Sequence, residues 1–520
     1  MSSQPSFRRY REAEDRPRRI AARLLSLLTY FTGLFYLGWS AFYYNSEHPV
    51  AAWILIVAEA GCLWLFVLAG TTLWRLRFKP PEGLEVKETP SVDILIPTCN
   101  EPENVIRTTL SAVSKIKWNG PLKVYILDDS GLDMIESMAK EFGYTYLSRK
   151  KSGEPLTDAK GGNLNYGYRN SKSDLIMTLD ADQVPDPEIL NKLAGYAFFK
   201  NVAFVQSKQS YITQVNDPFY NSSKVFYDTV ELGMDNMDTA ISAGTGVLYW
   251  RKALDEIGGF VTWNLVEDLT TSLELHAHGW RSFYFPHALS KGLAPDSIWK
   301  VYQQRGQWAL DTMRLFWWDN PMFKKGLALR SRLHYSTVAS SYIFSALALP
   351  FFFLMPIWTY LTGDAVFEDD FHTYLWIRGI YFFFMMAAVH FMCYKEAPAK
   401  QFRHLAGLFP LYFKNIFKAL LYPKGRKPKY RPNNSRTDRP KLEAKPHILA
   451  ILPQLLVIGL NMVVPFYAAH YETCSPRLIA GNAFLSAFAI WALADIVSAA
   501  LSRKRWPEGG SPDDIYGKIQ

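Results

Sequence analysis

The chain has 520 residues, of which 49% are hydrophobic, and a formal net charge of +9 at pH 7. Its length favours two or three domains. The positive charge does not indicate a nucleic-acid-binding protein, because the basic residues cluster beside long apolar runs. Four scattered cysteines without metal-ligand spacing argue against a disulfide framework and a cysteine metal site. The first apolar run is too long for a cleavable signal peptide.

Two apolar runs, 22–44 and 50–73, open the chain, and each is long enough to span a membrane. Lys and Arg flank the pair on both outer sides, whereas the loop between the runs contains neither. The positive-inside rule therefore places both outer ends in the cytoplasm. We expect a helical hairpin here.

From about residue 91 to residue 296 the pattern changes to alternating strands and helices. Five apolar segments predict buried strands, at 92–97, 123–127, 144–147, 174–179 and 202–207. Helical patterns at 104–115, 134–142 and 187–199 fall between several of them. This order predicts a mostly parallel sheet with helices on its faces, and such sheets bind ligands beyond the carboxyl ends of their strands.

Polar clusters follow three of these strands. They are Thr98-Cys99-Asn100-Glu101, Asp128-Asp129-Ser130 and Asp180-Ala181-Asp182. Three acidic clusters at three such ends favour one shared nucleotide–metal site over three unrelated turns. Two carboxylates one residue apart, after a buried strand, suit a divalent cation that is also held by waters and phosphate oxygens.

The second half of the chain returns to membrane-type patterns. A basic-aromatic segment (302–333) precedes two spans (335–361 and 374–394), and two further spans (448–469 and 480–501) end the apolar part. The amphipathic stretch 401–422 is predicted to lie in the membrane interface rather than to span. With six spans arranged 2 + 4 around one domain, every basic cluster faces the cytoplasm.

These patterns give the following expected domain organisation. It comprises a cytoplasmic tail (1–21), transmembrane helices 1–2 (22–78), a cytoplasmic α/β domain (90–300), interfacial helices (301–334), transmembrane helices 3–4 (335–396), an interfacial helix with a loop (400–446), transmembrane helices 5–6 (447–502) and a cytoplasmic tail (503–520). Polar residues inside the spans are costly in hydrocarbon, and they favour equally a hydrated channel and hydrogen bonds between helices (Glu59, His390, Asn461, Asp495).

Six short motifs occur in a fixed order along the chain. They are Pro97-Thr98-Cys99-Asn100-Glu101-Pro102, Asp128-Asp129, Lys160-Gly161-Gly162-Asn163, Asp180-Ala181-Asp182, Val266-Glu267-Asp268 and Gln304-Arg305-Gly306-Gln307-Trp308. Together they resemble the processive family-2 glycosyltransferases, most closely the bacterial cellulose synthase catalytic subunit and β-glucan (curdlan or mixed-linkage) synthases. The resemblance implies a GT-A-type α/β domain inserted in an α-helical membrane protein with about six transmembrane helices.

The resemblance also implies a set of donor-binding residues. Asp182, helped by Asp180, would hold Mg²⁺ or Mn²⁺, which neutralises a leaving diphosphate. Lys160 would meet the same phosphates, although a solvated loop lysine is the alternative. The remaining UDP contacts would come from the strand-end clusters and the last motif (Thr98, Asn100, Glu101, Asp128, Asp129, Gln304, Arg305 and Gln307). For Asp128 and Asp129 the alternative is an ordinary turn.

On the acceptor side the resemblance assigns Asp268 as the general base, with Glu267 beside it. One base with direct in-line displacement inverts the anomeric carbon and gives a β-linked product. The alternative is that either carboxylate caps the predicted helix 269–278. Trp308 would offer its indole face to the terminal sugar, and Gly244 and Thr245 would line the acceptor site.

Two departures from the family pattern concern the diphosphate. Gln307 stands where relatives have an arginine next to the tryptophan. Arg305 is near, but two residues along a helix points to roughly the opposite face. The basic loop at Lys429, Tyr430 and Arg431 is a gating-type element that could supply the charge, and a positive-inside anchor is its alternative role.

The sequence thus predicts a processive inverting enzyme of the bacterial inner membrane that polymerises UDP-glucose into a β-glucan (β-1,4, β-1,3 or mixed) and moves it across the bilayer. Its expected partners are the UDP-sugar, the growing polysaccharide, the lipid bilayer and secretion proteins, without nucleic acid. Other readings are a hyaluronan- or chitin-type synthase using UDP-N-acetylated sugars, a non-processive lipid glycosyltransferase, and an inactive synthase-like channel or assembly partner. Donor identity, linkage, product length and oligomeric state stay open.

Overall fold

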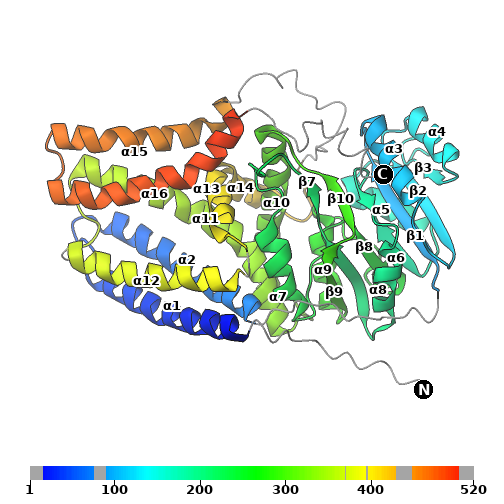
Figure 1. Ribbon diagram of the computed structural model, residues 1–520, viewed down its shortest axis with the longest axis horizontal. Coiled ribbons are helices and arrows are strands. Elements are labelled where there is room, and N and C mark those ends of the chain that lie inside the picture. Colours follow the sequence, from blue (N-terminus) through cyan, green and yellow to red (C-terminus); the bar gives the residue numbers. More distant parts are fainter. Residues whose placement is uncertain (1–15, 75–88, 369–370, 394–395, 429–447, 503–520) are drawn as a thin grey trace.

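The computed structural model describes residues 16–74, 89–368, 371–393, 396–428 and 448–502. A bundle of long helices lies at one end of the molecule and an α/β domain at the other (Figure 1). The predicted gating-type residues Lys429, Tyr430 and Arg431 lie outside the described residues.

A seven-stranded sheet, in the order β3-β2-β1-β4-β8-β6-β9, forms the centre of the α/β domain. Its strands are β1 (Val92–Thr98), β2 (Leu122–Asp128), β3 (Thr145–Leu147), β4 (Leu175–Thr178), β6 (Val202–Lys208), β8 (Val247–Trp250) and β9 (Arg281–Ala288). Of these seven, β8 alone runs antiparallel to its neighbours, so the predicted mostly parallel sheet is confirmed. A small sheet in the order β5-β10-β7 adds β5 (Val184–Pro185), β7 (Tyr211–Ile212) and β10 (Ser290–Leu293).

Helices cover both faces of the large sheet because its central strands are apolar on both sides. All seven residues of β1 are buried. Ile94 and Ile96 pack toward α3 (Glu103–Val113), α4 (Asp133–Glu141) and α6 (Ile189–Leu193). Leu95 points the other way, into the cluster with α5 (Ala159–Arg169), α8 (Arg251–Ile257) and α9 (Glu267–Ala277). Burial on both faces explains the continuous apolar runs in the sequence.

In the described part of the chain, six helices are long and apolar enough to cross a membrane. They are α1 (Arg16–Phe42), α2 (Pro49–Leu73), α11 (Leu329–Thr362), α12 (Phe371–Met392), α15 (Leu452–His470, after the short turn Ile448–Ile451) and α16 (Pro476–Leu501). They correspond to the six predicted spans. The longest, α11, starts six residues before the predicted span at 335 and continues into the bundle without interruption.

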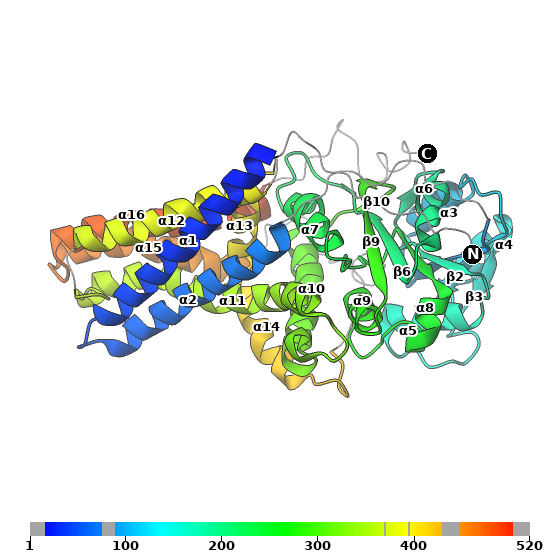
Figure 2. The same cartoon turned by 90° about the horizontal axis from the view of Figure 1, so that it is seen from below.

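The amphipathic stretch 401–422 was expected to be one helix, and this is wrong. It forms α13 (Pro398–Gly407) and α14 (Phe409–Leu421), which meet at Leu408. Pro410 lies in the first turn of α14, where its missing N–H is tolerated, and its ring would clash with a helix continuing from the N-terminal side. Both helices and α10 (Ile298–Trp318) lie where the bundle meets the α/β domain (Figure 2). Their location in a membrane interface stays a prediction.

Polar residues inside the candidate spans make contacts between helices. Glu59 pairs with Arg378 (2.7 Å), Asp495 pairs with Arg403 (2.8 Å), and the Asn461 amide donates to the Phe353 carbonyl (3.1 Å). The side chain of His390 is exposed on the outside of α12. Of the two roles that the sequence left open, the structure shows interhelical bonding for Glu59, Asn461 and Asp495.

Candidate functional site

A cavity of about 450 Å³ lies where the carboxyl ends of β1, β2 and β4 face α9 and α10. Seven carboxylates line it, from Glu101, Asp129, Asp180, Asp182, Glu231, Glu267 and Asp268. Against them stand two cationic side chains among the lining residues, Lys160 and Arg305. The wall therefore carries a surplus of negative charge that a bound cation would offset.

Asp180 and Asp182 both reach the cavity and form its candidate metal pair. The Asp180 backbone N–H donates to the Thr245 hydroxyl (3.0 Å), which fixes the turn after β4. Burial, followed by the charges of Asp180 and Glu101, raises the pKa of Asp182 to about 7. Within the described ranges no group of three or more His, Cys, Asp or Glu side chains could hold a metal. These two carboxylates fit a hard divalent cation that takes its other ligands from water and phosphate oxygens.

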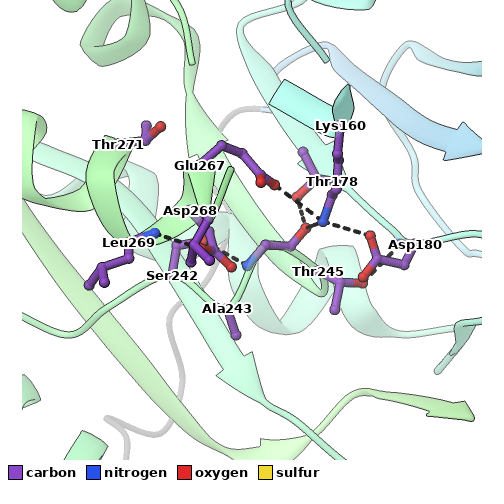
Figure 3. Close-up of polar contacts among 12 residues, drawn as sticks. Lys160, Thr178, Asp180, Ser242, Ala243, Thr245, Glu267, Asp268, Leu269 and Thr271 are labelled. Atoms are coloured by element: carbon purple, nitrogen blue, oxygen red, sulfur yellow. Dashed lines mark hydrogen bonds and ion pairs between the residues drawn. The ribbon is translucent and has the colours of Figure 1, made fainter. Parts of the chain in front are cut away.

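Lys160, in the first turn of α5, connects this pair to the carboxylates of α9. Its Nζ lies 2.7 Å from Asp180 Oδ1 and 3.4 Å from Glu267 Oε1, and it donates to the Gly244 carbonyl at 3.0 Å (Figure 3). Burial alone would lower the pKa of Lys160, but the surrounding carboxylates outweigh it and raise that pKa well above its usual value. Lys160 is therefore a fixed cation of the cavity and not a solvated loop lysine.

Glu267 and Asp268 are the first two residues of α9, and both face the cavity. The helix N-cap is Val266, without a side-chain capping bond, although the Leu269 N–H donates to Asp268 Oδ1 at 2.6 Å. Burial and the neighbouring Glu267 raise the pKa of Asp268 to about 7, against the opposing charge of Lys160. A carboxylate that exchanges its proton near neutral pH is suited to general base chemistry.

Gly244 separates the Lys160 ammonium from the Asp268 carboxylate. Its φ of +76° is a left-handed conformation. A Cβ built there would lie 2.8 Å from Asp268 Oδ2 and 2.9 Å from Lys160 Nζ. Both the backbone angle and the space therefore require glycine at this position. The next residue, Thr245, holds Asp180 through its hydroxyl, so this loop sets the spacing between the candidate base and the candidate metal pair.

At the end of β2, Asp129 forms a two-pronged ion pair with Arg149, a residue that the sequence analysis did not single out. The Nε–Oδ1 and Nη2–Oδ2 distances are 2.8 and 2.6 Å, and the Arg149 side chain is almost fully buried. A basic run, 149–151, begins two residues after the end of the third strand. This run is the feature of the sequence that could have pointed to a partner for Asp129. The pair leaves Asp129 in the cavity wall in a fixed orientation.

Two predicted donor-binding residues, Asp128 and Asn100, are not among the residues that line the cavity. The Asp128 carboxylate is fully buried, and it accepts hydrogen bonds from the Ser130 and Leu132 N–H groups (both 2.8 Å) and the Tyr146 hydroxyl (2.9 Å). These bonds correspond to the turn that the sequence left as the alternative. Thr98 and Glu101, by contrast, line the cavity and bond to each other at 2.6 Å.

The motif on α10 brings Gln304, Arg305, Gln307 and Trp308 to the cavity wall. Arg305 was expected to point to roughly the opposite helix face from position 307, and the structure shows that both Arg305 and Gln307 nevertheless line the cavity. Arg305 and Trp308 are three residues apart and share a helix face, and the Arg305 guanidinium carbon lies 4.6 Å from the Trp308 ring centroid. One face of the indole is thus covered by a cation.

Gln307 donates a hydrogen bond to Asp311, whose other oxygen lies 2.7 Å from Arg314 in a fully buried ion pair. Arg314 in turn donates to the carbonyls of Tyr422, Pro423 and Arg426, which lie in the segment that follows α14. An arginine at position 307 would meet the Asp311 carboxylate and stay beside the cavity.

We expect Gln307→Arg to fold normally and to retain or raise turnover, because it adds a cation that Asp311 can hold. Steady-state release of the nucleotide product from purified protein measures this. Gln303→Arg is the matched control, since Gln303 also lines the cavity from α10. A large loss specific to Gln307→Arg would show that the Gln307 amide itself contacts a substrate.

Part of the cavity wall is formed by residues that no local sequence pattern could assign to it. Tyr211 and Tyr227 come from the α/β domain, Val338 and Tyr342 from α11, and Gln401 from α13. They are separated from the strand-end motifs by up to three hundred residues. The cavity therefore reaches from the sheet to the helices of the bundle.

Comparisons with known proteins show which families and proteins the chain is similar to. Residues 90–310 match the family model described as "Glycosyltransferase like family 2", and residues 255–396 match "Cellulose synthase". The chain is 32% identical over 305 residues to cellulose synthase 1 catalytic subunit [UDP-forming] of Komagataeibacter xylinus, covering 56% of this chain and 40% of that protein. It is 32% identical over 276 residues to the cellulose synthase catalytic subunit of Xanthomonas axonopodis pv. citri, covering 51% of this chain and 37% of that protein.

The chain thus spans about two fifths of the length of the curated relatives it matches. Among solved structures, it is similar to the mannosyltransferase PcManGT from Pyrobaculum calidifontis in complex with GDP-Man and Mn²⁺. That match has a TM-score of 0.47 and 17% identity, and it covers 66% of this chain and all of the other.

Proposed function

Because this chain carries a family-2 glycosyltransferase domain between helices long enough to span a membrane, we propose that it is a processive, inverting membrane glycosyltransferase. It polymerises glucose from UDP-glucose into a β-glucan and moves the product across the bilayer. One observation carries this proposal: the half-buried Asp268 carboxylate shares a cavity wall with the Asp180–Asp182 pair, and Lys160 lies between them.

On the donor side, Asp180 and Asp182 would hold Mg²⁺ or Mn²⁺. A cation held there would supply positive charge to the diphosphate, which would then leave as a stabilised anion. Lys160 supplies a fixed positive charge at the same end of the cavity, and Asp129, oriented by Arg149, is the strand-end carboxylate available to the nucleoside. The curated relatives' names specify a UDP-forming reaction, which supports UDP as the leaving group.

On the acceptor side, Asp268 takes the proton from the attacking hydroxyl. The hydroxyl oxygen forms a bond to the anomeric carbon as the bond from that carbon to the diphosphate breaks, so the α-linked donor gives a β-linked product. No second catalytic carboxylate is required for this displacement, and Glu267 acts by raising the pKa of Asp268. Trp308 stands where a ring face can meet the terminal sugar.

The route that we propose for the product follows the residues that line the cavity, which include Tyr342 of α11 and Gln401 of α13. A chain extended at Asp268 would leave along these residues, toward the bundle. The Lys and Arg residues that flank the spans favour a cytoplasmic location for the catalytic domain, and the membrane that we propose is a bacterial inner membrane. Secretion proteins that receive the polymer are the expected partners.

A donor panel tests the proposal. Purified protein in lipid, with Mg²⁺ or Mn²⁺, is given UDP-glucose, UDP-N-acetylglucosamine, UDP-glucuronate and GDP-mannose, and release of the nucleoside diphosphate is followed. Any product is then digested with linkage-specific glucanases.

UDP release with UDP-glucose and a product cut by a β-glucanase support the proposal and identify the linkage. Turnover with N-acetylated donors alone would instead favour a hyaluronan- or chitin-type synthase. Absence of turnover with every donor, despite UDP binding, would overturn the polymerase proposal in favour of a lipid acceptor or an inactive partner.

A further inference from the structure

One carboxyl group of the cavity wall, that of Glu231, has no role in the reaction proposed above. Its side chain lines the cavity, and the residue is only 2% exposed. Glu231 Oε2 accepts a hydrogen bond from the Ile241 N–H at 3.2 Å. Among the described residues, none bonds to Oε1 and no Lys, Arg or His forms an ion pair with this carboxyl group. Because buried polar groups are rarely left without partners, the free oxygen indicates a ligand that completes it.

The carboxylates at the donor end of the cavity are held by cations. Asp180 contacts Lys160 at 2.7 Å, and Asp129 pairs with Arg149 at 2.6 Å. The described residues offer Glu231 no such cation, and burial raises the pKa of Glu231 to about 8. At pH 7 this carboxyl group is therefore mostly protonated and neutral. A neutral carboxyl group can both donate and accept a hydrogen bond, which suits a sugar hydroxyl rather than a phosphate.

The chain before Glu231 is shaped to direct this side chain into the cavity. Phe226–Val230 forms a π-helical turn that leads into α7 (Glu231–Asp235), and the Glu231 N–H donates to the Phe226 carbonyl. This i→i+5 bond places residues five apart on one side of the turn, and Phe226, Tyr227 and Glu231 all line the cavity. Such turns are rare in helices and are frequent at functional sites.

The contacts of Ile241, the hydrogen-bond partner of Glu231, place this carboxyl group on the acceptor side of the cavity. Ile241 packs in one apolar cluster with Leu269, which directly follows Asp268, and with Val338 of α11. Ile241 and Val338 line the cavity as well. In the proposed reaction the acceptor lies against Asp268 and the product leaves toward the bundle, so it passes this part of the wall.

We propose that Glu231 is a specificity-determining residue for the acceptor, and that its carboxyl group hydrogen-bonds a hydroxyl of a neutral terminal sugar. The proposal rests on the proposed function, because it specifies how the same reaction recognises its neutral glucan. The sugar hydroxyl supplies the partner that Oε1 lacks, while the Ile241 N–H keeps Oε2 in place. Glu231 takes no part in the bond changes, for which Asp268 remains the base.

Binding of neutral oligosaccharides tests this without requiring turnover. Wild-type protein in lipid nanodiscs, with UDP and Mn²⁺, is titrated calorimetrically with cellotetraose and with laminaritetraose, which represent β-1,4 and β-1,3 linkage. We expect at least one of them to bind. Glu231→Met, which keeps the size of the side chain, should weaken that binding about tenfold or more, because the sugar hydroxyl is buried without its partner. Glu231→Gln should retain most of the affinity, since an amide also donates and accepts.

Acceptors that each lack one hydroxyl of the terminal glucose identify the group that Glu231 holds. One monodeoxy tetrasaccharide should bind wild-type protein about tenfold more weakly than its parent does. The same compound should bind Glu231→Met as well as the parent does, because the interaction is already lost. A purely structural role of Glu231 would instead weaken the parent and every monodeoxy compound alike. The wild-type comparison remains informative even where a variant does not fold.

Asp228→Asn is the matched control. Asp228 belongs to the same π-helical turn, pairs with Lys208 and is not among the residues that line the cavity. This variant should bind the tetrasaccharide as wild type does, and UDP binding by each variant shows that the donor end is intact. Three results would each overturn the proposal: no binding of either tetrasaccharide by wild type, unchanged affinity in Glu231→Met, or the same affinity for all monodeoxy compounds and their parent.

The two proposals fail separately. Absence of nucleotide release in the donor panel would overturn the polymerase, while Glu231-dependent binding of a neutral oligosaccharide would still be measurable by titration. Conversely, β-glucan synthesis with an unchanged acceptor KM in Glu231→Met would overturn the role of Glu231 alone.

Discussion

Asp268→Asn should lower the rate of sugar transfer by about 10²- to 10⁴-fold, the usual contribution of a positioned general base. The amide keeps the size of the side chain and can still accept a hydrogen bond from the Leu269 N–H, but it cannot take a proton from the acceptor. UDP binding should be largely unchanged, because Asp268 lies on α9 and the metal pair follows β4.

The same substitution should raise the melting temperature. Because folding raises the pKa of Asp268 from 3.8 to about 7, ionisation of this carboxyl costs folded-state stability progressively between those pH values, and the full cost remains above them. The neutral amide removes that cost. Glu274→Gln, on the same helix but paired with Lys324, is the control for both measurements. An Asp268→Asn protein with near-normal polymer output would remove Asp268 from the mechanism.

Lys160→Met should lower turnover at pH 7 by about 10²- to 10³-fold, comparable to the loss of a fixed charge-stabilising group in other active sites. Methionine keeps the length of the side chain without the ammonium that contacts Asp180 and Glu267. Weaker donor binding should account for part of this loss, which separate measurements of kcat and KM resolve.

A change in the pH profile of activity should distinguish the loss of the Lys160 charge from a purely structural defect. The base works when deprotonated, so wild-type activity should fall as the pH drops below about 7. Lys160 lowers the pKa of Asp268, and its removal raises that pKa further. The acidic limb of the Lys160→Met profile should therefore move to higher pH, whereas Lys151→Met, at a surface lysine paired with Asp133 and Glu136, should leave it in place. A limb that stays or moves to lower pH contradicts the proposed coupling.

The sequence was sufficient to predict the strands whose residues are mostly apolar. The five predicted strands are all present, and in four of them, β1, β2, β4 and β6, the central residues are buried on both faces. The fifth, β3, is exposed or half-buried. β8 is a short apolar run that the sequence analysis did not single out, and β9 becomes exposed toward its end. β5 and β7, which lie on either side of β10, have two residues each, and this is too few for any periodicity.

The site residues were predictable where polar side chains come directly after the end of a strand. Asp180, Asp182 and Lys160 could be placed by this rule and by the motif order, and the structure brings them together. The rule failed for Asp128, because its carboxylate accepts hydrogen bonds from the backbone of the turn that follows it. It could not find Arg149 or Tyr342, because their positions depend on how distant elements pack. The single break between α13 and α14 was visible as Pro410, but the apolar periodicity continued across it.

The cavity limits which fragments of this protein can be active. Its walls are shared: the sheet supplies the carboxylates, while α10, α11 and α13 supply Trp308, Tyr342 and Gln401. α11 is one uninterrupted helix of 34 residues that carries part of this wall and then continues through the bundle. A soluble fragment ending near residue 300 would retain the donor half and lose the acceptor half. Such a fragment should bind nucleotide yet be unable to extend a chain. The helix bundle is therefore a structural part of the candidate site, and the protein has to be studied in lipid or detergent that keeps the bundle intact.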